Sequence, residues 1–193
     1  MILSAPLVTI SANAPYLFGH DLWAETRIPL FEQAVDLGDL AHPACGRVSF
    51  GSDYLRASPL EPFVANLEQH AVLLPVCSGD APSHFRHLRL HNGTIWRWNR
   101  PLLGTDADGR PHLRIEYRTL PAGPTLADML ANAAAYVGLV HELVERGMAE
   151  RPAVPFAAAR ANFYAAARLG LAALTVWPGA AEGTAATLLA ERL

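Results

Sequence analysis

The chain has 193 residues, of which 51% are hydrophobic and 17% are charged, a composition typical of a folded domain with a sizeable core. Its formal net charge of −3 argues against a general nucleic-acid or membrane binder, and no apolar run reaches the roughly 20 residues that a membrane span needs. The two cysteines, Cys45 and Cys77, form no Cys-x-x-Cys pair, so we expect a reducing, cytoplasmic setting.

The amino-terminal part of the chain predicts short elements separated by turns. Residues 22–35 carry apolar side chains at helical spacing, and Pro29 is expected to delay the start of that helix. The other expected elements are, in chain order, a strand over 7–10, a polar turn over 11–15, a loop over 38–59 with a short strand near 48–50, a helix over 60–70, a strand over 72–76 and a loop over 78–83.

The segment 87–119 predicts a long β-hairpin with one cationic face. Side chains alternate between the two faces of a strand, and Thr-Asp-Ala-Asp-Gly at 105–109 is typical of the connecting turn. The polar face collects His87, Arg89, His91, Arg97, His112, Arg114, Glu116 and Arg118, and the apolar, core-facing side collects Leu88, Leu90, Trp96, Trp98, Leu113, Ile115 and Tyr117.

Positive charge is concentrated in this hairpin. Seven of the fifteen basic residues, all arginines, lie between residues 86 and 118, among only three acids, Asp106, Asp108 and Glu116. An arginine fork grips phosphate or carboxylate at two points, and magnesium takes oxygen ligands such as a carboxylate. The hairpin therefore predicts an anion site suited to phosphoryl transfer, which needs positioning and positive charge more than a nucleophile. Strict alternation places Arg97 and Arg100 on opposite faces unless a bulge intervenes.

The carboxy-terminal part predicts helices. Thr125 with Asp128 matches a capping box, and an apolar stripe continues to about residue 147. An alanine-rich helix over 156–174 and a short last helix over 180–193 follow. Because strands precede helices, we expect an α+β fold in which the carboxy-terminal helices pack on an antiparallel sheet. We expect one domain over 1–193, with a strand-rich part, 1–121, and a helical part, 122–193.

Most of these signals also have a purely structural interpretation. Glu116 and Arg118 fit an exposed lattice of ion pairs with the opposite strand, and Asn13 fits a turn former. Arg97 and Arg100 fit a solvated strand face whose side chains lie over the tryptophans. Two metal sites are weakly indicated: His84, His87 and His91 have the spacing of zinc ligands on a helix but lack a fourth ligand, and residues 106–109 match only part of a calcium loop. The aromatic residues Trp96, Trp98 and Tyr117 share the parity of the core-facing side, so they are better suited to the core than to stacking on nucleobases.

Five stretches, in order along the chain, resemble the glutamate–cysteine ligase family of carboxylate–amine ligases, which shares its fold with glutamine synthetase. They are 11–15 (Ser-Ala-Asn-Ala-Pro), 22–27 (Leu-Trp-Ala-Glu-Thr-Arg), 91–100 (His-Asn-Gly-Thr-Ile-Trp-Arg-Trp-Asn-Arg), 114–118 (Arg-Ile-Glu-Tyr-Arg), and 161–162 with 166–171. The resemblance implies that ATP phosphorylates the side-chain carboxylate of glutamate. An amine, cysteine's in the best-known members, then attacks the acyl phosphate, as in glutathione biosynthesis.

The resemblance also implies roles for particular residues. Glu116 corresponds to a magnesium ligand, and Arg118 to the arginine that contacts the transferring phosphate. Arg27 lies where the family has an arginine that helps to bind substrate, although it also fits a helix surface charge paired with Glu25. Further candidates for binding phosphate or substrate are Arg97, Arg100, Arg114 and Asn13.

The chain departs from the family in its acidic residues. Family members are longer, and their amino-terminal half carries a cluster of glutamates that binds most of the magnesium, whereas this chain has no Glu-x-Glu. We therefore expect a partial glutamine-synthetase-like domain, matching the carboxy-terminal half, that self-associates or needs a missing amino-terminal half. The alternative is a non-catalytic nucleotide- or anion-binding module, or a pseudoenzyme acting through a partner. A single-stranded nucleic-acid binder is opposed by the net charge.

Overall fold

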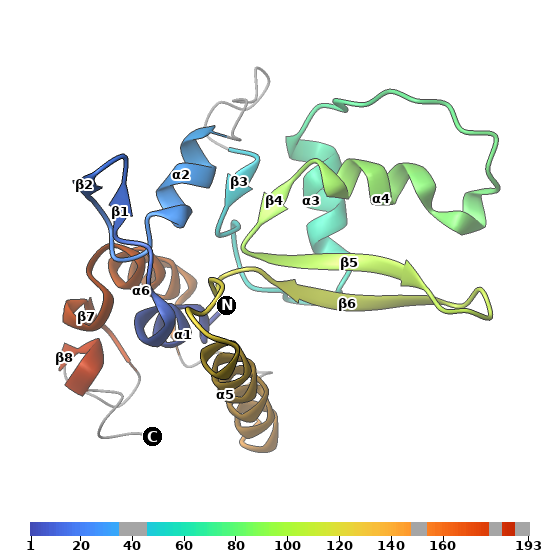
Figure 1. Ribbon diagram of the computed structural model, residues 1–193. Coiled ribbons are helices and arrows are strands. Elements are labelled where there is room, and N and C mark those ends of the chain that lie inside the picture. Colours follow the sequence, from blue (N-terminus) through green and yellow to red (C-terminus); the bar gives the residue numbers. More distant parts are fainter. Residues whose placement is uncertain (35–45, 148–153, 178–182, 188–193) are drawn as a thin grey trace. The chain divides into compact units, whose positions relative to one another are not determined.

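The computed structural model describes residues 1–34, 46–147, 154–177 and 183–187. It divides into two compact units, one formed by residues 1–29 with 119–193 and the other by residues 30–118 (Figure 1). Helices and short, mostly antiparallel strand pairs make up the described residues, so the predicted α+β class is confirmed.

The first unit is built on the packing of α1 (Ser4–Ser11) against α6 (Phe156–Leu169). Leu7, Val8 and Phe163 are fully buried. The strand predicted over 7–10 is therefore wrong. The β-branched run there favours a strand by propensity, but burial against a neighbouring helix decides the conformation.

The prediction for the long helix is confirmed. α5 (Leu126–Glu145) begins with the capping box, in which Asp128 N donates to Thr125 Oγ1 at 3.2 Å and Thr125 N donates to Asp128 Oδ2 at 3.1 Å. α6 ends earlier than predicted, because Gly170 turns the chain with φ +55°, where a Cβ would also press on Ala24 at 3.2 Å.

Short elements complete this unit. They are β1 (Tyr16–Leu17) paired with β2 (His20–Asp21), η2 (Gly170–Ala172), and β7 (Leu174–Thr175) paired with β8 (Gly183–Thr184). Of the last predicted helix, Gly183–Thr184 is a strand, 185–187 is helical, and the rest lies outside the described residues. The Asn162 side chain fastens the chain after β7, because it donates to Val176 O at 2.7 Å and accepts from Val176 N at 3.0 Å.

The second unit holds the elements around the hairpin. In chain order the structure has α2 (Arg27–Ala34), which begins in the first unit, β3 (Val48–Ser49), α3 (Glu61–Gln69), η1 (Pro82–His84), α4 (Arg86–Gly93), β4 (Trp96–Arg97), β5 (Asn99–Thr105) and β6 (Pro111–Tyr117). The helix near 22–35, the strand near 48–50 and the helix over 60–70 are confirmed, and Pro29 lies in the first turn of α2. The strand over 72–76 is wrong, since this exposed run finds no neighbouring strand.

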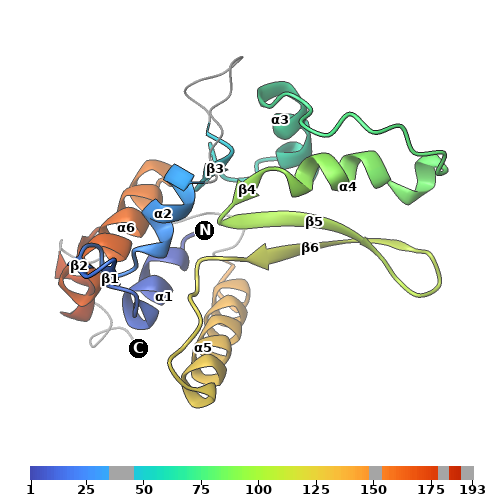
Figure 2. The same cartoon turned by 45° about the horizontal axis from the view of Figure 1, so that its top comes forward.

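The hairpin is real but shorter than predicted. β5 and β6 lie side by side as an antiparallel ribbon, in register from Asn99 opposite Tyr117 to Thr105 opposite Pro111 (Figure 2). The turn is confirmed, with Gly109 at φ +83°. The predicted first arm is wrong over 87–93, which forms α4 and packs on α3. His87 and His91, four residues apart, satisfy the helical spacing as well as the strand period.

The faces of the hairpin also differ from the prediction. Trp98 is 0% exposed and belongs to the core, as predicted. Leu113 and Ile115 are 42% and 54% exposed, so the apolar face of β6 is not core in this chain. The period-two pattern correctly grouped Leu113 and Ile115 on one face of β6, but it could not show whether another layer covers that face.

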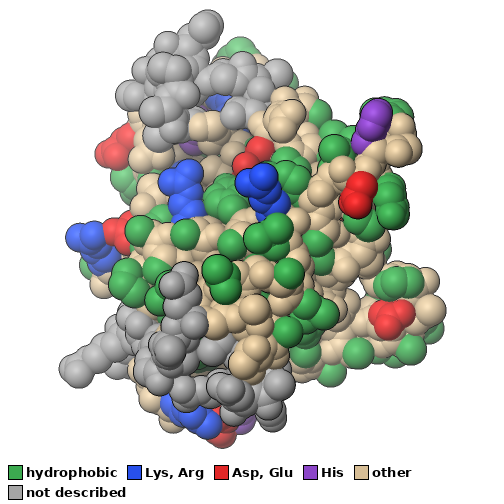
Figure 3. Space-filling view, turned by 90° about the vertical axis from the view of Figure 1, so that its left-hand side faces the viewer, with side chains coloured by type: hydrophobic (Ala, Val, Ile, Leu, Met, Phe, Trp, Pro, Cys, Tyr) green, Lys and Arg blue, Asp and Glu red, His purple; other side chains and the backbone are tan. Residues whose placement is uncertain are grey.

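Acidic and basic side chains are scattered over the described part of the face drawn in Figure 3, some of them beside one of opposite sign, and form no broad patch of one sign. Within the described ranges, no helix has both the length and the apolar character that crossing a membrane requires.

Candidate functional site

Two arginines converge on one glutamate at the base of the hairpin. Arg100 and Glu116 are direct cross-strand partners, and the Arg100 guanidinium reaches Glu116 Oε2 through Nε at 2.9 Å and Nη2 at 2.7 Å. Arg118 Nη1 lies 3.4 Å from the same oxygen. We call Arg100, Glu116, Arg118 and the neighbouring Trp96 the hairpin cluster.

An aromatic stack fixes the position of Arg118 in this cluster. Its guanidinium carbon lies 3.2 Å from the centroid of the Trp96 ring, a cation–π contact, and Trp96 in turn packs on Phe31 with ring centroids 4.6 Å apart. The Arg118 backbone N–H donates to Trp98 O at 2.9 Å. The predicted alternative, that Trp96 stacks on nucleobases, is less suitable because the ring is already stacked within the protein.

The residues present fit magnesium only in part. Arg100 and Arg118 both approach Glu116 at Oε2, so neither arginine uses Oε1, the oxygen that could serve as a magnesium ligand. Magnesium is often held by one or two carboxylates together with substrate phosphates. Among the described residues there is no group of three or more His, Cys, Asp or Glu side chains that could hold an ion. One carboxylate ligand therefore fits, and a site made by these residues alone does not.

Two other predicted candidates contact residues other than Glu116. Arg97 is 7% exposed and donates to Asn66 Oδ1 through Nε at 3.2 Å and Nη2 at 3.0 Å. Arg114 Nη1 lies 2.9 Å from His112 Nε2 in an exposed chain that also includes Asp106. The structure therefore brings Arg100 and Arg118 to Glu116, but not Arg97 or Arg114.

The three histidines whose spacing would suit zinc on a helix are arranged differently in the structure. His87 Nε2 lies 3.0 Å from Val76 O, and His91 Nε2 lies 3.0 Å from Asn66 O. His84 lies in η1, outside the helix α4 that carries the other two. The backbone carbonyls explain the two ring positions, and no metal is needed to account for them.

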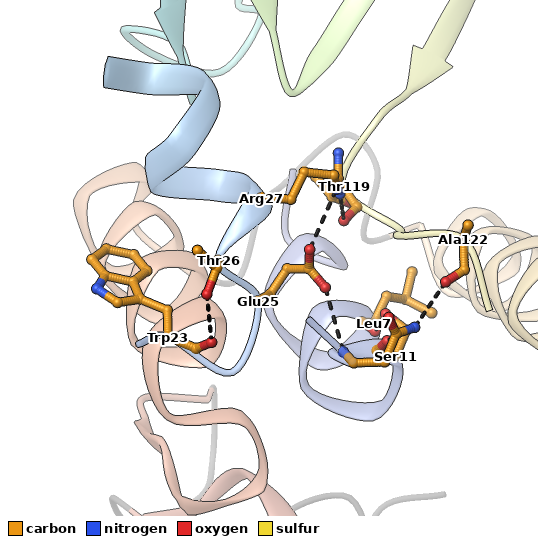
Figure 4. Close-up of polar contacts among 9 residues, drawn as sticks. Leu7, Ser11, Trp23, Glu25, Thr26, Arg27, Thr119 and Ala122 are labelled. Carbon is orange, nitrogen blue, oxygen red and sulfur yellow. Dashed lines mark hydrogen bonds and ion pairs between the residues drawn. The ribbon is translucent and has the colours of Figure 1, made fainter. Parts of the chain in front are cut away.

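A second cluster forms in the first unit around a carboxylate whose burial the sequence did not reveal (Figure 4). Glu25 is 0% exposed. Its Oε1 lies 3.4 Å from Arg27 Nε, and its Oε2 accepts from Asn13 N at 3.4 Å. Arg27 Nη2 donates to Thr119 O at 2.9 Å. We call Asn13, Glu25, Arg27 and Thr119 the Glu25 cluster.

The backbone explains why these residues meet. Ala24 N donates to Arg168 O at 3.1 Å and Glu25 N donates to Ala167 O at 2.8 Å, so the last turn of α6 receives partners for its terminal carbonyls. Ala14 bridges Glu25 as a parallel neighbour, and Asn13 Nδ2 donates to Ala122 O at 2.8 Å. Three stretches far apart in the sequence, 11–15, 22–27 and 161–171, therefore meet here.

The electrostatics of the Glu25 cluster are those of a buried ion pair. Burial lowers the pKa of Arg27, and the Glu25 carboxylate opposes that shift. The pairing of Arg27 with Glu25, considered from the sequence as an alternative, is thus present. Moving both charges out of water costs free energy, which offsets much of their attraction. The ion pair therefore fixes the position of the Arg27 guanidinium but adds little to the net stability of the fold.

Removing the Glu25 charge should expose this dependence. We expect Glu25→Gln to lower the free energy of unfolding by about 3 kcal/mol, near the low end for breaking a buried pair, because the Arg27 side chain keeps some solvent contact. Urea unfolding measures the change. The double variant Glu25→Gln/Arg27→Met should recover part of the loss, since it leaves no unpaired buried charge. A double variant less stable than Glu25→Gln would contradict the pairing.

Comparisons with known proteins give one finding. A model of the family described as glutamate–cysteine ligase family 2 matches residues 2–193. Neither the curated proteins nor the solved structures contain a match. The family match covers both clusters and nearly the whole chain, so it does not depend on a single short motif.

Proposed function

Because the chain belongs to glutamate–cysteine ligase family 2, we propose that it takes part in an ATP-dependent ligation of the glutamate side chain to an amine. In this proposal an acyl phosphate forms on the side-chain carboxylate, and an amine such as that of cysteine displaces the phosphate to give a γ-glutamyl amide. The observation that carries the proposal is the hairpin cluster, in which a stacked arginine and a carboxylate held through one oxygen by Arg100 lie within the matched region.

The proposed roles follow from the contacts in the hairpin cluster. Arg118, held on Trp96, donates to oxygens of the transferring phosphate, where a fixed cation stabilises the charge of the transition state. Glu116 presents Oε1 as a magnesium ligand, while Arg100 holds Oε2 and fixes the carboxylate plane. Magnesium, when bound, neutralises phosphate charge.

The Glu25 cluster is proposed to bind substrate. Arg27 carries a guanidinium that is fixed in position by Thr119 O at Nη2 and by Glu25 at Nε, and a fixed guanidinium fork suits recognition of a substrate carboxylate. Asn13 supports this arrangement through its contacts with Glu25 and Ala122. Arg97 and Arg114 are left out of the proposed site, because their contacts are with Asn66 and His112.

The proposed site needs more carboxylates than these residues offer. The reaction implied by the family uses several magnesium ions, and Glu116 supplies one carboxylate among the described residues of the hairpin cluster. We therefore propose that a further polypeptide segment completes the ligase domain to which residues 1–193 contribute. We also propose that the protein acts in the cytoplasm. ATP, glutamate and the amine are its substrates.

A turnover assay tests this incompleteness. The purified chain, supplied with ATP, magnesium, glutamate and cysteine, is expected to release no ADP above the rate seen without the two amino acids. A glutamate–cysteine ligase assayed in parallel serves as the positive control. ADP release that requires both glutamate and cysteine would show that the site is complete and would overturn this part of the proposal.

The second candidate function is a nucleotide-binding module that catalyses no reaction. It is favoured by one observation: two arginines share the single carboxylate Glu116, and the positive charge that remains suits anion binding even without metal. Its signature is ATP binding of equal strength with and without magnesium.

A further inference from the structure

Two adjacent residues of α2, Phe31 and Glu32, contact both tryptophans that precede β5. The Phe31 ring stacks on Trp96 with ring centroids 4.6 Å apart, and it meets the Trp98 ring edge-on at 6.4 Å. Glu32 Oε1 accepts a hydrogen bond from Trp98 Nε1 at 3.0 Å. All four residues belong to the second unit. The second half of α2 therefore helps to orient both indole rings.

The backbone of the two tryptophans is held by a different element. Trp96 N donates to Arg47 O at 2.7 Å. Trp98 N donates to Ser49 O at 3.1 Å, so the chain around β3 fixes the strand that carries both rings. An indole ring on a fixed backbone still has two side-chain torsions, which settle into rotamers. The contacts with α2 restrict these torsions.

Arg118 contacts both tryptophans, in two different ways. Its guanidinium carbon lies 3.2 Å from the centroid of the Trp96 ring, and its backbone N–H donates to Trp98 O at 2.9 Å. The guanidinium and the Phe31 ring lie too close to the Trp96 ring to share one face of it, so the indole lies between them. Phe31, Trp96 and Arg118 thus form a three-layer stack that joins α2 to the hairpin cluster.

Core packing alone does not explain a tryptophan at position 96. Phe31 and Trp96 are both half-buried, and Trp96 Nε1 is a buried donor that has no hydrogen-bond partner among the described residues. Such a donor costs free energy that a purely apolar side chain would avoid. Tryptophan is also the aromatic residue that attracts a guanidinium most strongly. The contact with Arg118 therefore accounts for the tryptophan.

From these contacts we propose that Phe31 is a positioning residue for phosphate binding, which acts through Trp96 on Arg118. The inference rests on the proposed function, in which Arg118 binds the transferring phosphate. A guanidinium that is ordered before the ligand arrives loses less conformational entropy on binding. Releasing it should weaken the binding of magnesium–ATP by about three- to tenfold, the cost of immobilising one long side chain.

Calorimetric titration of the full chain with magnesium–ATP measures this effect. Phe31→Leu keeps an apolar side chain but removes the ring, and it should bind about three- to tenfold more weakly than the wild type. Phe31→Tyr restores a ring and should bind within about twofold of the wild type. Leu30→Ala, at a position 41% exposed on the same helix, is the matched control and should show no loss. Unchanged circular dichroism verifies that each variant is folded.

A double-mutant cycle separates positioning from a purely structural role. In an Arg118→Ala background, Phe31→Leu should weaken ATP binding by less than about twofold, because the side chain through which Phe31 acts is absent. A loss by the same factor in both backgrounds would show that Phe31 supports the fold in general, and it would overturn the inference. So would a Phe31→Leu chain that binds as tightly as the wild type.

Nuclear magnetic resonance tests the positioning of Arg118 without ATP. A proton over the face of an indole ring resonates upfield, so the Nε–H signal of Arg118, identified by its absence from Arg118→Ala, should lie upfield in the wild type. Phe31→Leu should lose that shift, and a retained shift would contradict the inference whether or not ATP binds. If the wild type binds no ATP but Phe31→Leu loses the shift, the proposed function fails while the positioning of Arg118 by Phe31 stands.

Discussion

Replacing Arg118 with alanine is expected to weaken the binding of magnesium–ATP by about 10- to 100-fold, because hydrogen bonds to charged groups contribute about 1.5–3 kcal/mol. The guanidinium is already ordered by Trp96 at 3.2 Å and by Glu116 at 3.4 Å, so little side-chain freedom is lost when phosphate binds. Isothermal titration calorimetry of the wild-type and variant chains measures the difference.

Arg110→Ala is the matched control for this experiment. It removes the same charge from the same hairpin, but Arg110 is 82% exposed at the turn and pairs only with Asp108 among the described residues. We expect it to bind ATP within about twofold of the wild type, since exposed charges are screened by salt. Equal losses in the two variants would mean that the hairpin attracts ATP through its overall charge rather than through Arg118.

Trp98→Ala is expected to have the largest effect on stability, a loss of about 3–5 kcal/mol in the free energy of unfolding. Trp98 is 0% exposed, its Nε1 donates to Glu32 Oε1 at 3.0 Å, and its ring meets Phe31 edge-on at 6.4 Å. Its backbone accepts from Arg118 N and donates to Ser49 O, so it also anchors the base of the hairpin. Urea unfolding followed by circular dichroism measures the loss.

Ile115→Ala provides the comparison for Trp98→Ala. Ile115 lies on β6 of the same hairpin but is 54% exposed, so its truncation should change the free energy of unfolding by no more than about 0.5 kcal/mol. Similar unfolding midpoints for the two variants would contradict the assignment of Trp98 to the core and would place the stabilising contacts of the second unit elsewhere.

Local signals in the sequence predicted the elements whose structure is set locally. The capping box at Thr125 and the turn ending at Gly109 both formed as expected, because each depends on neighbouring residues alone. Period-two alternation predicted that Glu116 shares a face with arginines, but it placed Arg97 on that face and Arg100 on the opposite one, whereas Arg100 is the observed partner. The sequence could not identify Arg100 rather than Arg97 as the partner, since that choice depends on where the strand begins.

Elements whose structure depends on distant neighbours were predicted less well. The run 7–10 is β-branched, but it is buried as a helix against α6, which lies about 150 positions away in the sequence. Residues 87–93 satisfy both periods, and packing on α3 selected the helix. The burial of Glu25 depends on segments from three parts of the chain, so no local pattern could reveal it.

Titration of ATP into the wild-type chain, with and without magnesium, tests the central claim most directly. The claim is that Glu116 and Arg118 form one wall of a magnesium–ATP site. It predicts that magnesium tightens ATP binding by tenfold or more, because Glu116 Oε1 then joins the ion held by the phosphates. ATP binding of equal strength with and without magnesium, or no ATP binding at all, would contradict it.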